Sequence, residues 1–322
     1  MFLLAVALLV FTTSLTAQTQ SRAERRARVD SVLSQRYYKT PYDTNYVVRP
    51  EGRLTLKVRM NQTGNSFHAR GMVNDVYAKA DLSTSHKTTF SLAAIYRGIG
   101  VGVAINPAKW GGAYKDYEFN LNCYSSRLSL DLSYQRSESL TGDMLFDEVP
   151  KRLEQGDATM KVLNVAAYYT FNHRRFSFPA AFTQSYIQRH SAGSFLLAFS
   201  GQGQRADTKA TYESVLKVTN IGIGAGYGYN WVPARNWLLH ISALPTFIVY
   251  SHTSLRVNEE RIPVKYHFPE VIITSRGAIV KQFGNMFVGT SMVFNFTNIG
   301  DEEQLAVHNI KWRTRLFVGF RL

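Results

Sequence analysis

The chain has 322 residues, a formal net charge of +14 at pH 7, a mean hydropathy of −0.17, 13% aromatic residues and one cysteine, Cys123. One cysteine excludes an internal disulfide framework, and beyond the N-terminus no run of about 18 apolar residues could form a transmembrane helix. The basic residues are scattered over alternating segments and loops without a recognition motif, which argues against nucleic-acid binding.

The N-terminus is typical of a secretory signal peptide. Residues 2–11 are uniformly apolar but too few to span a bilayer as a helix, and residues 12–17 become small and polar. We predict a signal peptide over residues 1–17, with a buried N-terminal helix as the alternative. No cysteine follows this segment, which argues against a lipid anchor. The exported chain is then either soluble in the periplasm or a barrel in the outer membrane of a Gram-negative bacterium.

Residues 18–50 are predicted to be a periplasmic segment. Ser21 to Tyr38 is polar and charged with a sparse apolar stripe, the pattern of a short amphipathic helix, and Pro41 ends it.

From residue 51 the sequence alternates between apolar and polar residues, with turn-rich breaks between the alternating segments. In residues 54–61 every second residue is Leu, Val or Met, and the residues between them are polar or basic. A two-sheet sandwich would alternate similarly, but here large lipid-type residues form one face of nearly every segment. Residues 51–322 are therefore predicted to form a transmembrane antiparallel β-barrel, an all-β fold. Candidate strands lie at about 53–61, 73–83, 88–97, 98–106, 116–125, 127–136, 160–171, 194–204, 215–230, 236–250, 268–282, 286–297 and 310–322.

These thirteen segments cannot all span, because a single-chain bacterial barrel with both termini in the periplasm has an even number of strands. Counting back from the C-terminus, long breaks alternate with short ones, which places 298–309, 251–267 and 137–159 outside. The break at 172–193 falls on the periplasmic side despite its length. Either 53–61 or 73–83 is then surplus, and we predict about twelve strands.

The tryptophans and the C-terminus support the same fold. Trp110, Trp231, Trp237 and Trp312 lie at or beside predicted strand ends, where indole rings occupy the interfacial girdles of a barrel. The last eleven residues alternate without exception between an apolar and a polar face and resemble the closing strand of an outer-membrane barrel.

The polar faces predict a basic lumen. The alternation along the strands points five basic side chains into the lumen. A basic lumen favours anionic solutes, and basic loops favour the phosphates of lipopolysaccharide. The predicted lumen-facing residues are Lys57, Arg59, Arg313, Arg315 and Arg321.

One segment, Phe176 to Ser194, breaks the strand pattern. Pro179 suits the first turn of a helix, and Gly193 suits its end, so a helix over about 179–190 is predicted to plug the barrel. We expect it to pack against a stripe of glycines on one face of a nearby strand. The alternative is that the glycines relieve wall curvature and the helix caps the barrel from outside. The plug residues are Pro179, Phe182, Gln184, Gln188, Ser191 and Gly193, and the stripe is Gly222, Gly224, Gly226 and Gly228.

Three motifs resemble a known family. Tyr42-Asp43-Thr44-Asn45-Tyr46, the Phe176 to Ser185 segment with Ser191-Ala192-Gly193-Ser194, and Gly226-Tyr227-Gly228-Tyr229-Asn230 are similar to motifs of the domain of unknown function family numbered four-four-two-one. The resemblance covers nearly the whole mature chain. It implies an exported barrel of the Gram-negative outer membrane and carries over no catalytic residues.

The sequence offers few candidate catalytic or metal-binding residues. His240 and Ser242 share one strand face like a base and its nucleophile, and Asn236 could orient the imidazole, but the position near a short periplasmic turn favours a hydrogen-bonding role in the lumen. No metal-ligand spacing, P-loop or Rossmann fingerprint appears. We predict no catalytic residues, cofactor or metal.

Three functions stay open, in this order. The first is a non-enzymatic barrel for solute passage or envelope organisation, the second an accessory of a secretion or surface-assembly machine, and the third a membrane-embedded lipid hydrolase. Expected partners are outer-membrane lipids and lipopolysaccharide, with a periplasmic or envelope protein as a further candidate.

Overall fold

The computed structural model describes residues 22–38, 42–50, 52, 54–73, 76–96, 99–105, 116–146, 148–208, 214–257, 260–263, 270–300 and 306–322. The chain divides into two compact units, residues 1–40 and residues 41–322. In the first unit, helix α2 spans Arg22–Tyr38. The predicted signal peptide and Trp110 lie outside the described residues. Within those residues, no helix has the length and apolar content needed to cross a bilayer.

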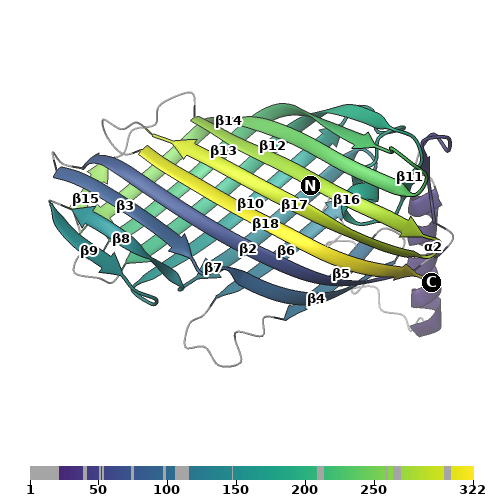
Figure 1. Ribbon diagram of the computed structural model, residues 1–322, viewed down its shortest axis with the longest axis horizontal. Coiled ribbons are helices and arrows are strands. Elements are labelled where there is room, and N and C mark those ends of the chain that lie inside the picture. The colour runs from purple at the N-terminus through teal and green to yellow at the C-terminus, as the bar shows by residue number, and fades with distance from the viewer. Residues whose placement is uncertain are drawn as a thin grey trace. The chain divides into compact units, whose positions relative to one another are not determined.

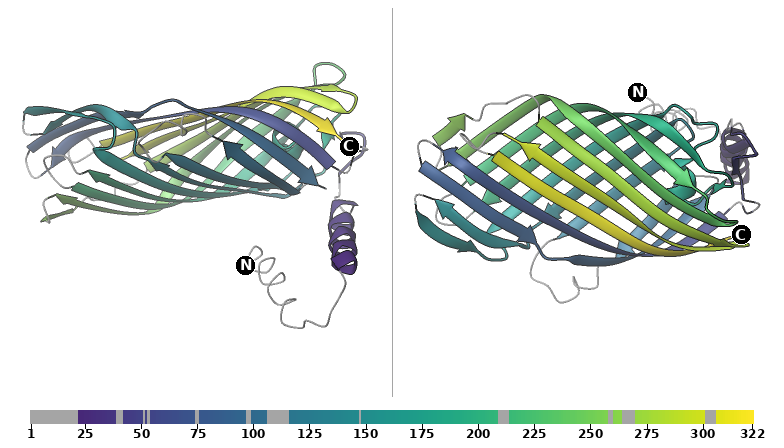
Figure 2. Two further views of the ribbon diagram at one scale, coloured as in Figure 1. Left: turned by 90° about the horizontal axis from the view of Figure 1, so that it is seen from below. Right: turned by 45° about the horizontal axis from the view of Figure 1, so that its top comes forward.

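The second unit is a curled antiparallel β-sheet of the barrel type, which confirms the predicted fold class (Figures 1 and 2). Among the described residues the sheet has sixteen strands, and twelve of them occupy successive positions around the wall. The last strand pairs with the first, so that Phe320 lies opposite Leu56. The twelve strands are β2 (Leu54–Val73), β4 (Lys87–Tyr96), β5 (Ile99–Ile105), β6 (Tyr117–Tyr124), β7 (Leu128–Ser137), β10 (Ala158–Thr170), β12 (Ala192–Thr208), β13 (Ser214–Trp231), β14 (Trp237–Val257), β16 (Glu270–Phe283), β17 (Met286–Ile299) and β18 (Ala306–Arg321).

The two ends of the barrel differ in their connections. Short turns at 232–236 and 284–285 join strands at the end where β2 begins and β18 ends. We call this the proximal end, and the opposite one the distal end. The proximal end is the one that the sequence assigns to the periplasm.

The surplus candidate strand is the segment 73–83. Its described part forms β3 (Val76–Thr84), which pairs with the distal half of β2, from Val73 to Ser66. The chain then passes Ser85 and His86 and continues as β4 along the proximal half of β2. Since β3 and β4 pair with the same edge of β2, together they fill one position in the wall.

The ring closes between β4 and β7 in two ways. On the distal side β3 pairs with β8 (Leu140–Phe146), from Ala78 opposite Phe146 to Thr84 opposite Leu140. On the proximal side β5 and β6 are in contact, but within the described ranges no hydrogen-bonded ladder joins them. The neighbouring ladders therefore hold this part of the wall.

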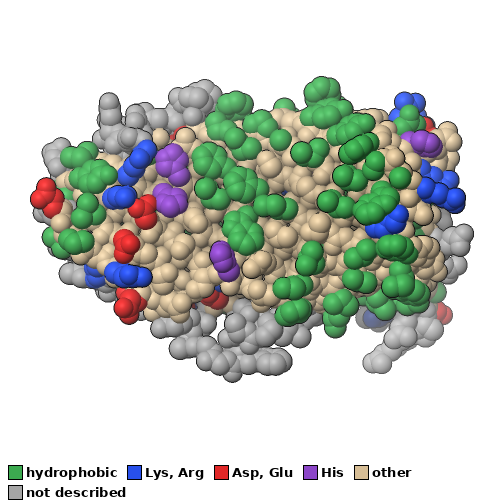
Figure 3. Space-filling model, viewed as in Figure 1, with side chains coloured by type: hydrophobic (Ala, Val, Ile, Leu, Met, Phe, Trp, Pro, Cys, Tyr) green, Lys and Arg blue, Asp and Glu red, His purple; other side chains and the backbone are tan. Residues whose placement is uncertain are grey.

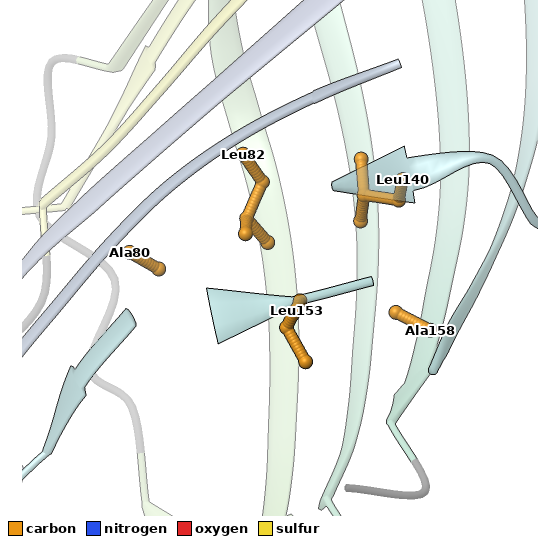
Figure 4. Close-up of a cluster of buried hydrophobic side chains, with 5 residues drawn as sticks. All are labelled: Ala80, Leu82, Leu140, Leu153 and Ala158. Carbon is orange, nitrogen blue, oxygen red and sulfur yellow. The ribbon is translucent and has the colours of Figure 1, made fainter. Parts of the chain in front are cut away.

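The long break predicted at 137–159 contains two strands. β8 and β9 (Val149–Leu153) form a hairpin there, and Leu140 and Leu153 pack with Leu82 of β3 (Figure 4). Ala80 and Ala158 complete this small apolar core. The predicted loop 251–267 likewise contains β15 (Glu260–Pro263), which pairs with the distal end of β14.

The outer wall is apolar, and the inner wall is polar. Along β18 the residues Leu316, Val318 and Phe320 are exposed, whereas Phe317 and Arg321 on the opposite face are buried. Figure 3 shows hydrophobic side chains over the visible wall, with most charged side chains towards its ends. This arrangement is the one that a barrel surrounded by lipid requires.

Candidate functional site: the plugged lumen

The segment between β10 and β12 enters the proximal end of the barrel and fills it. It begins with helix α3 (Phe178–Phe182), whose five residues are all buried. Ser177 caps the helix by accepting a hydrogen bond from Ala180 N through its side chain, and Pro179 occupies the first turn. The segment then reaches β11 (Ile187–Gln188). We call residues 176–190 the plug.

The predicted helix over 179–190 is too long. The amides of Thr183 and Gln184 both donate to Pro179 O, and Gln184 adopts a left-handed backbone with φ of 57°. A left-handed residue ends an α-helix. The backbone of residues 187–188 pairs instead with β1 (Val47–Val48) of the N-terminal segment.

Two of the five predicted lumen-facing basic residues hold the plug. Lys57 Nζ donates to Phe182 O at 3.1 Å and also to Gln184 Oε1, and Arg321 Nη2 donates to Gln184 O at 3.1 Å. Each cation also lies over an aromatic ring of the wall, Lys57 over Phe317 at 4.0 Å and Arg321 over Phe287 at 4.7 Å. Lys57 and Arg321 are buried, so these bonds are shielded from water.

A third anchor is Asn230 at the proximal end of β13. Its amide nitrogen donates to Ser177 O and to Gln188 Oε1, both at 3.0 Å. Asn230 Oδ1 can only accept a hydrogen bond, so His240 Nδ1, at 2.7 Å, carries the hydrogen and donates it. His240 Nε2 is then left to accept the hydroxyl hydrogen of Ser242, at 3.0 Å.

Ser242, His240 and Asn230 therefore have the connectivity of a nucleophile, a base and an orienting amide. The group is sealed, however. Ser242 is 2% exposed, and the rings of Phe176, Phe178 and Phe182 lie 5.9, 5.3 and 5.0 Å from the imidazole of His240. The residue that orients His240 is Asn230, directly across the β13–β14 ladder, and not Asn236, which lies in the proximal turn.

The N-terminal segment covers the plug from the other side. Tyr42 shares a hydrogen bond of 3.1 Å with Ser177, and His190 Nδ1 lies 2.6 Å from Asn45 O. Arg189 N donates to Tyr46 O at 2.7 Å. Burial raises the pKa of the Tyr42 hydroxyl, so this contact stays uncharged at neutral pH.

The predicted plug-packing glycines lie at two kinds of contact. A Cβ on Gly228 would lie 3.0 Å from the Phe176 ring. The absence of a side chain at this position therefore leaves room for Phe176 of the plug. Cβ atoms on Gly222, Gly224 and Gly226 would instead meet atoms of β14 in the wall itself, which allows β13 and β14 to approach closely. Of the other predicted plug residues, Ser191 Oγ accepts from Val232 N at 2.9 Å, and Gly193 lies against the Tyr227 hydroxyl.

Distal to the plug, the lumen contains a cavity of about 150 Å³ with Phe182 in its lining. Arg276, Lys311, Arg313 and Arg315 line it, and Arg59 is a diagonal neighbour of Arg315 across the β2–β18 ladder. These five cations face two carboxylates. Arg276 binds Asp131 at 2.6 Å, and Arg313 pairs with Glu118.

The cationic layer has unused donors. Among the described residues, the Nε atoms of Arg59, Arg276 and Arg315 have no hydrogen-bond partner although they are buried. A buried, unpaired guanidinium N–H is costly. The lumen therefore offers an anion both excess positive charge and free hydrogen-bond donors.

We also searched the described part of the chain for groups of metal-ligating side chains. It contains no group of three or more His, Cys, Asp or Glu side chains placed to hold an ion.

Residues 41–322 match the model of the family described as Domain of unknown function (DUF4421). The chain belongs to the DUF4421 family. This confirms the resemblance seen in the sequence motifs. No curated protein matches the sequence.

Several solved barrels are similar to this DUF4421 chain at very low identity. They are the outer membrane protease OmpT from Escherichia coli (6% identity, 85% of this chain and 97% of that one, TM-score 0.46), the transport unit of the autotransporter AIDA-I from Escherichia coli (11%, 91% and 97%, 0.38) and the outer membrane protein OprG from Pseudomonas aeruginosa (9%, 85% and 99%, 0.28). These likenesses carry no argument about activity.

The three DUF4421 motifs meet at the plug. Residues 42–46 cover it, residues 176–185 form it, and residues 226–230 supply the glycine and the amide against which it packs. The sequence motifs alone gave no indication of this contact, because the segments are far apart along the chain. Of the residues that matter here, sequence reasoning missed Asn230 and Arg276.

Proposed function

We propose that the protein is a non-enzymatic barrel of the bacterial outer membrane that binds an anionic solute in its lumen and is closed at its proximal end by the plug. The observation that carries this proposal is the layer of guanidinium groups in the lumen, three of which have a buried Nε without a hydrogen-bond partner among the described residues. A cationic lumen with free donors favours anions. The apolar outer wall supports the membrane location.

The plug supports a closed resting state. It is held by Lys57, Arg321 and Asn230, which lie on different strands of the wall. Solute that reaches the cationic layer from the distal end would therefore stop there until the plug moves. Binding and passage are two separable steps in this proposal.

The experiment is a conductance measurement in planar bilayers. The intact protein should conduct little, and a variant in which a short Gly-Ser linker replaces residues 176–190 should form an open channel that prefers anions. The double variant Arg59→Gln, Arg315→Gln in the same background should lose much of this preference, and Arg205→Gln, at an exposed residue, should keep it. A cation-preferring channel, or conductance unchanged by the deletion, would contradict the proposal.

The Ser242, His240 and Asn230 geometry gives the lipid hydrolase reading its best support. We nevertheless propose a structural role, because the hydroxyl is sealed beneath three phenylalanine rings and Asn230 is committed to the plug. The role as an accessory of a secretion or surface-assembly machine would use the proximal surface, where Arg127, Arg174, Arg175 and Arg189 are exposed.

A further inference from the structure

The cavity has two layers along the barrel axis. The cationic layer, with Arg276 and Arg315 in the lining and Arg59 beside Arg315 in the wall, lies next to the plug. The second layer lies further towards the distal end, and the register shows this, because Lys311 and Asn309 follow Arg315 and Arg313 in the distal direction along β18. Amide side chains dominate this amide layer, which comprises Asn65, Asn120, Gln135, Asn164, Gln202, Asn295 and Asn309.

The amide layer has unused acceptors. Asn65 Oδ1, Gln135 Oε1 and Asn309 Oδ1 are buried and have no hydrogen-bond partner within the described ranges. An amide oxygen needs a donor such as a hydroxyl group. Inorganic phosphate, sulfate and chloride carry no more than a proton or two to donate, so a simple anion satisfies the cationic layer and leaves the amide layer unpaired.

We infer that the cavity recognises a phosphorylated sugar, with its phosphate on the guanidinium groups of Arg276 and Arg315 and its hydroxyls on the amides of Asn65, Gln135 and Asn309. This inference rests on the proposed function and names its ligand class. Guanidinium groups bind phosphate oxygens in a matching planar geometry.

The charge and size of the cavity support this class. Asp131 and Glu118 neutralise only part of the charge of the five cations, and the remaining excess suits a phosphate monoester, which carries about −1.5 to −2 charges at pH 7. A carboxylate would supply only one negative charge. At about 150 Å³ the cavity is smaller than the roughly 300–1,000 Å³ of common ligand pockets, which argues against a sugar chain as the ligand.

The test is calorimetric titration of the whole protein in lauryldimethylamine oxide, a detergent without sugar or phosphate groups. The probes are glucose 6-phosphate, mannose 6-phosphate, inorganic phosphate and glucose. At least one sugar phosphate should bind about tenfold or more tightly than both inorganic phosphate and glucose, since two or more amide hydrogen bonds are added.

Variants separate the two layers. Asn309→Leu should weaken sugar phosphate binding about tenfold and leave phosphate binding unchanged, whereas Arg315→Gln should weaken both. Asn298→Leu, at an exposed asparagine on the neighbouring strand, is the matched control and should change neither. Heat-modifiable migration on gels checks that each variant is folded.

Each outcome decides a different claim. If phosphate binds as tightly as both sugar phosphates, the inference is overturned and the proposed anion site stands. If glucose binds as tightly as the sugar phosphates, or if none of the four probes binds, the anion site itself fails.

Discussion

Replacing Asn230 by leucine tests how the plug is held. Leucine keeps the approximate size of the side chain and removes every hydrogen bond that Asn230 makes. Ser177 O and His240 Nδ1 then lose their partners, whereas Gln188 Oε1 still accepts from Ser177 N at 3.2 Å. Each buried group without a partner costs about 1–3 kcal/mol, so the closed plug is destabilised by about 2–6 kcal/mol.

This cost falls on the closed state, because water reaches both groups once the plug leaves the lumen. At 1.4 kcal/mol for each factor of ten, the ratio of open to closed plug should rise about 30-fold to 20,000-fold. Single-channel recordings in planar bilayers measure this ratio as the fraction of time spent conducting.

Asn220→Leu is the matched control for this experiment. Asn220 lies on the same strand and the same face, is also buried, and accepts a hydrogen bond from Ser251 in the wall and not from the plug. It should leave the open fraction unchanged. A folded Asn230→Leu barrel that conducts no more than Asn220→Leu would refute the role of Asn230 as a plug anchor.

Three further predictions concern other parts of the barrel. Lys57→Met should also raise the open fraction, because Phe182 O and Gln184 lose their cationic donor, and recordings that show a closed channel would contradict this. Leu316→Asp should lower the free energy of unfolding in urea more than Phe320→Asp, because a charge costs more near the bilayer middle than near its surface; equal losses would argue against the lipid-facing wall. Ser242→Ala should leave any ester-hydrolysing activity of the purified protein at its background level, and a loss of activity would revive the hydrolase reading.

The fold class and the two faces of the wall could be predicted because each depends on a short-range pattern. The period of two along Leu54 to Asn61 or along β18 assigns each side chain to lipid or lumen without any knowledge of its neighbours. By the same pattern, the sequence assigns Arg59, Arg313 and Arg315 to one face of the wall, and the β2–β18 register keeps them on one face.

Features that depend on register could not be predicted. His240 faces Asn230 because the turn at 232–236 sets the pairing of β13 with β14, and a reading along the sequence offered Asn236 instead. The hairpin of β8 and β9 is stabilised by the pairing of β8 with β3, which lies far away in the chain. The sequence also could not show which basic residues hold the plug and which line the cavity, because that depends on where along the barrel axis the plug ends.

The anchors of the plug also lie on both sides of the place where the chain closes on itself. Lys57 is on the first strand of the wall and Arg321 is the last residue of the final strand, and both bind Gln184. Before β18 has paired with β2, Lys57 and Arg321 are not yet neighbours, so the two of them cannot bind Gln184 together. Sealing of the pore is therefore tied to completion of the wall, so a chain truncated at its C-terminus would be not only unfinished but leaky.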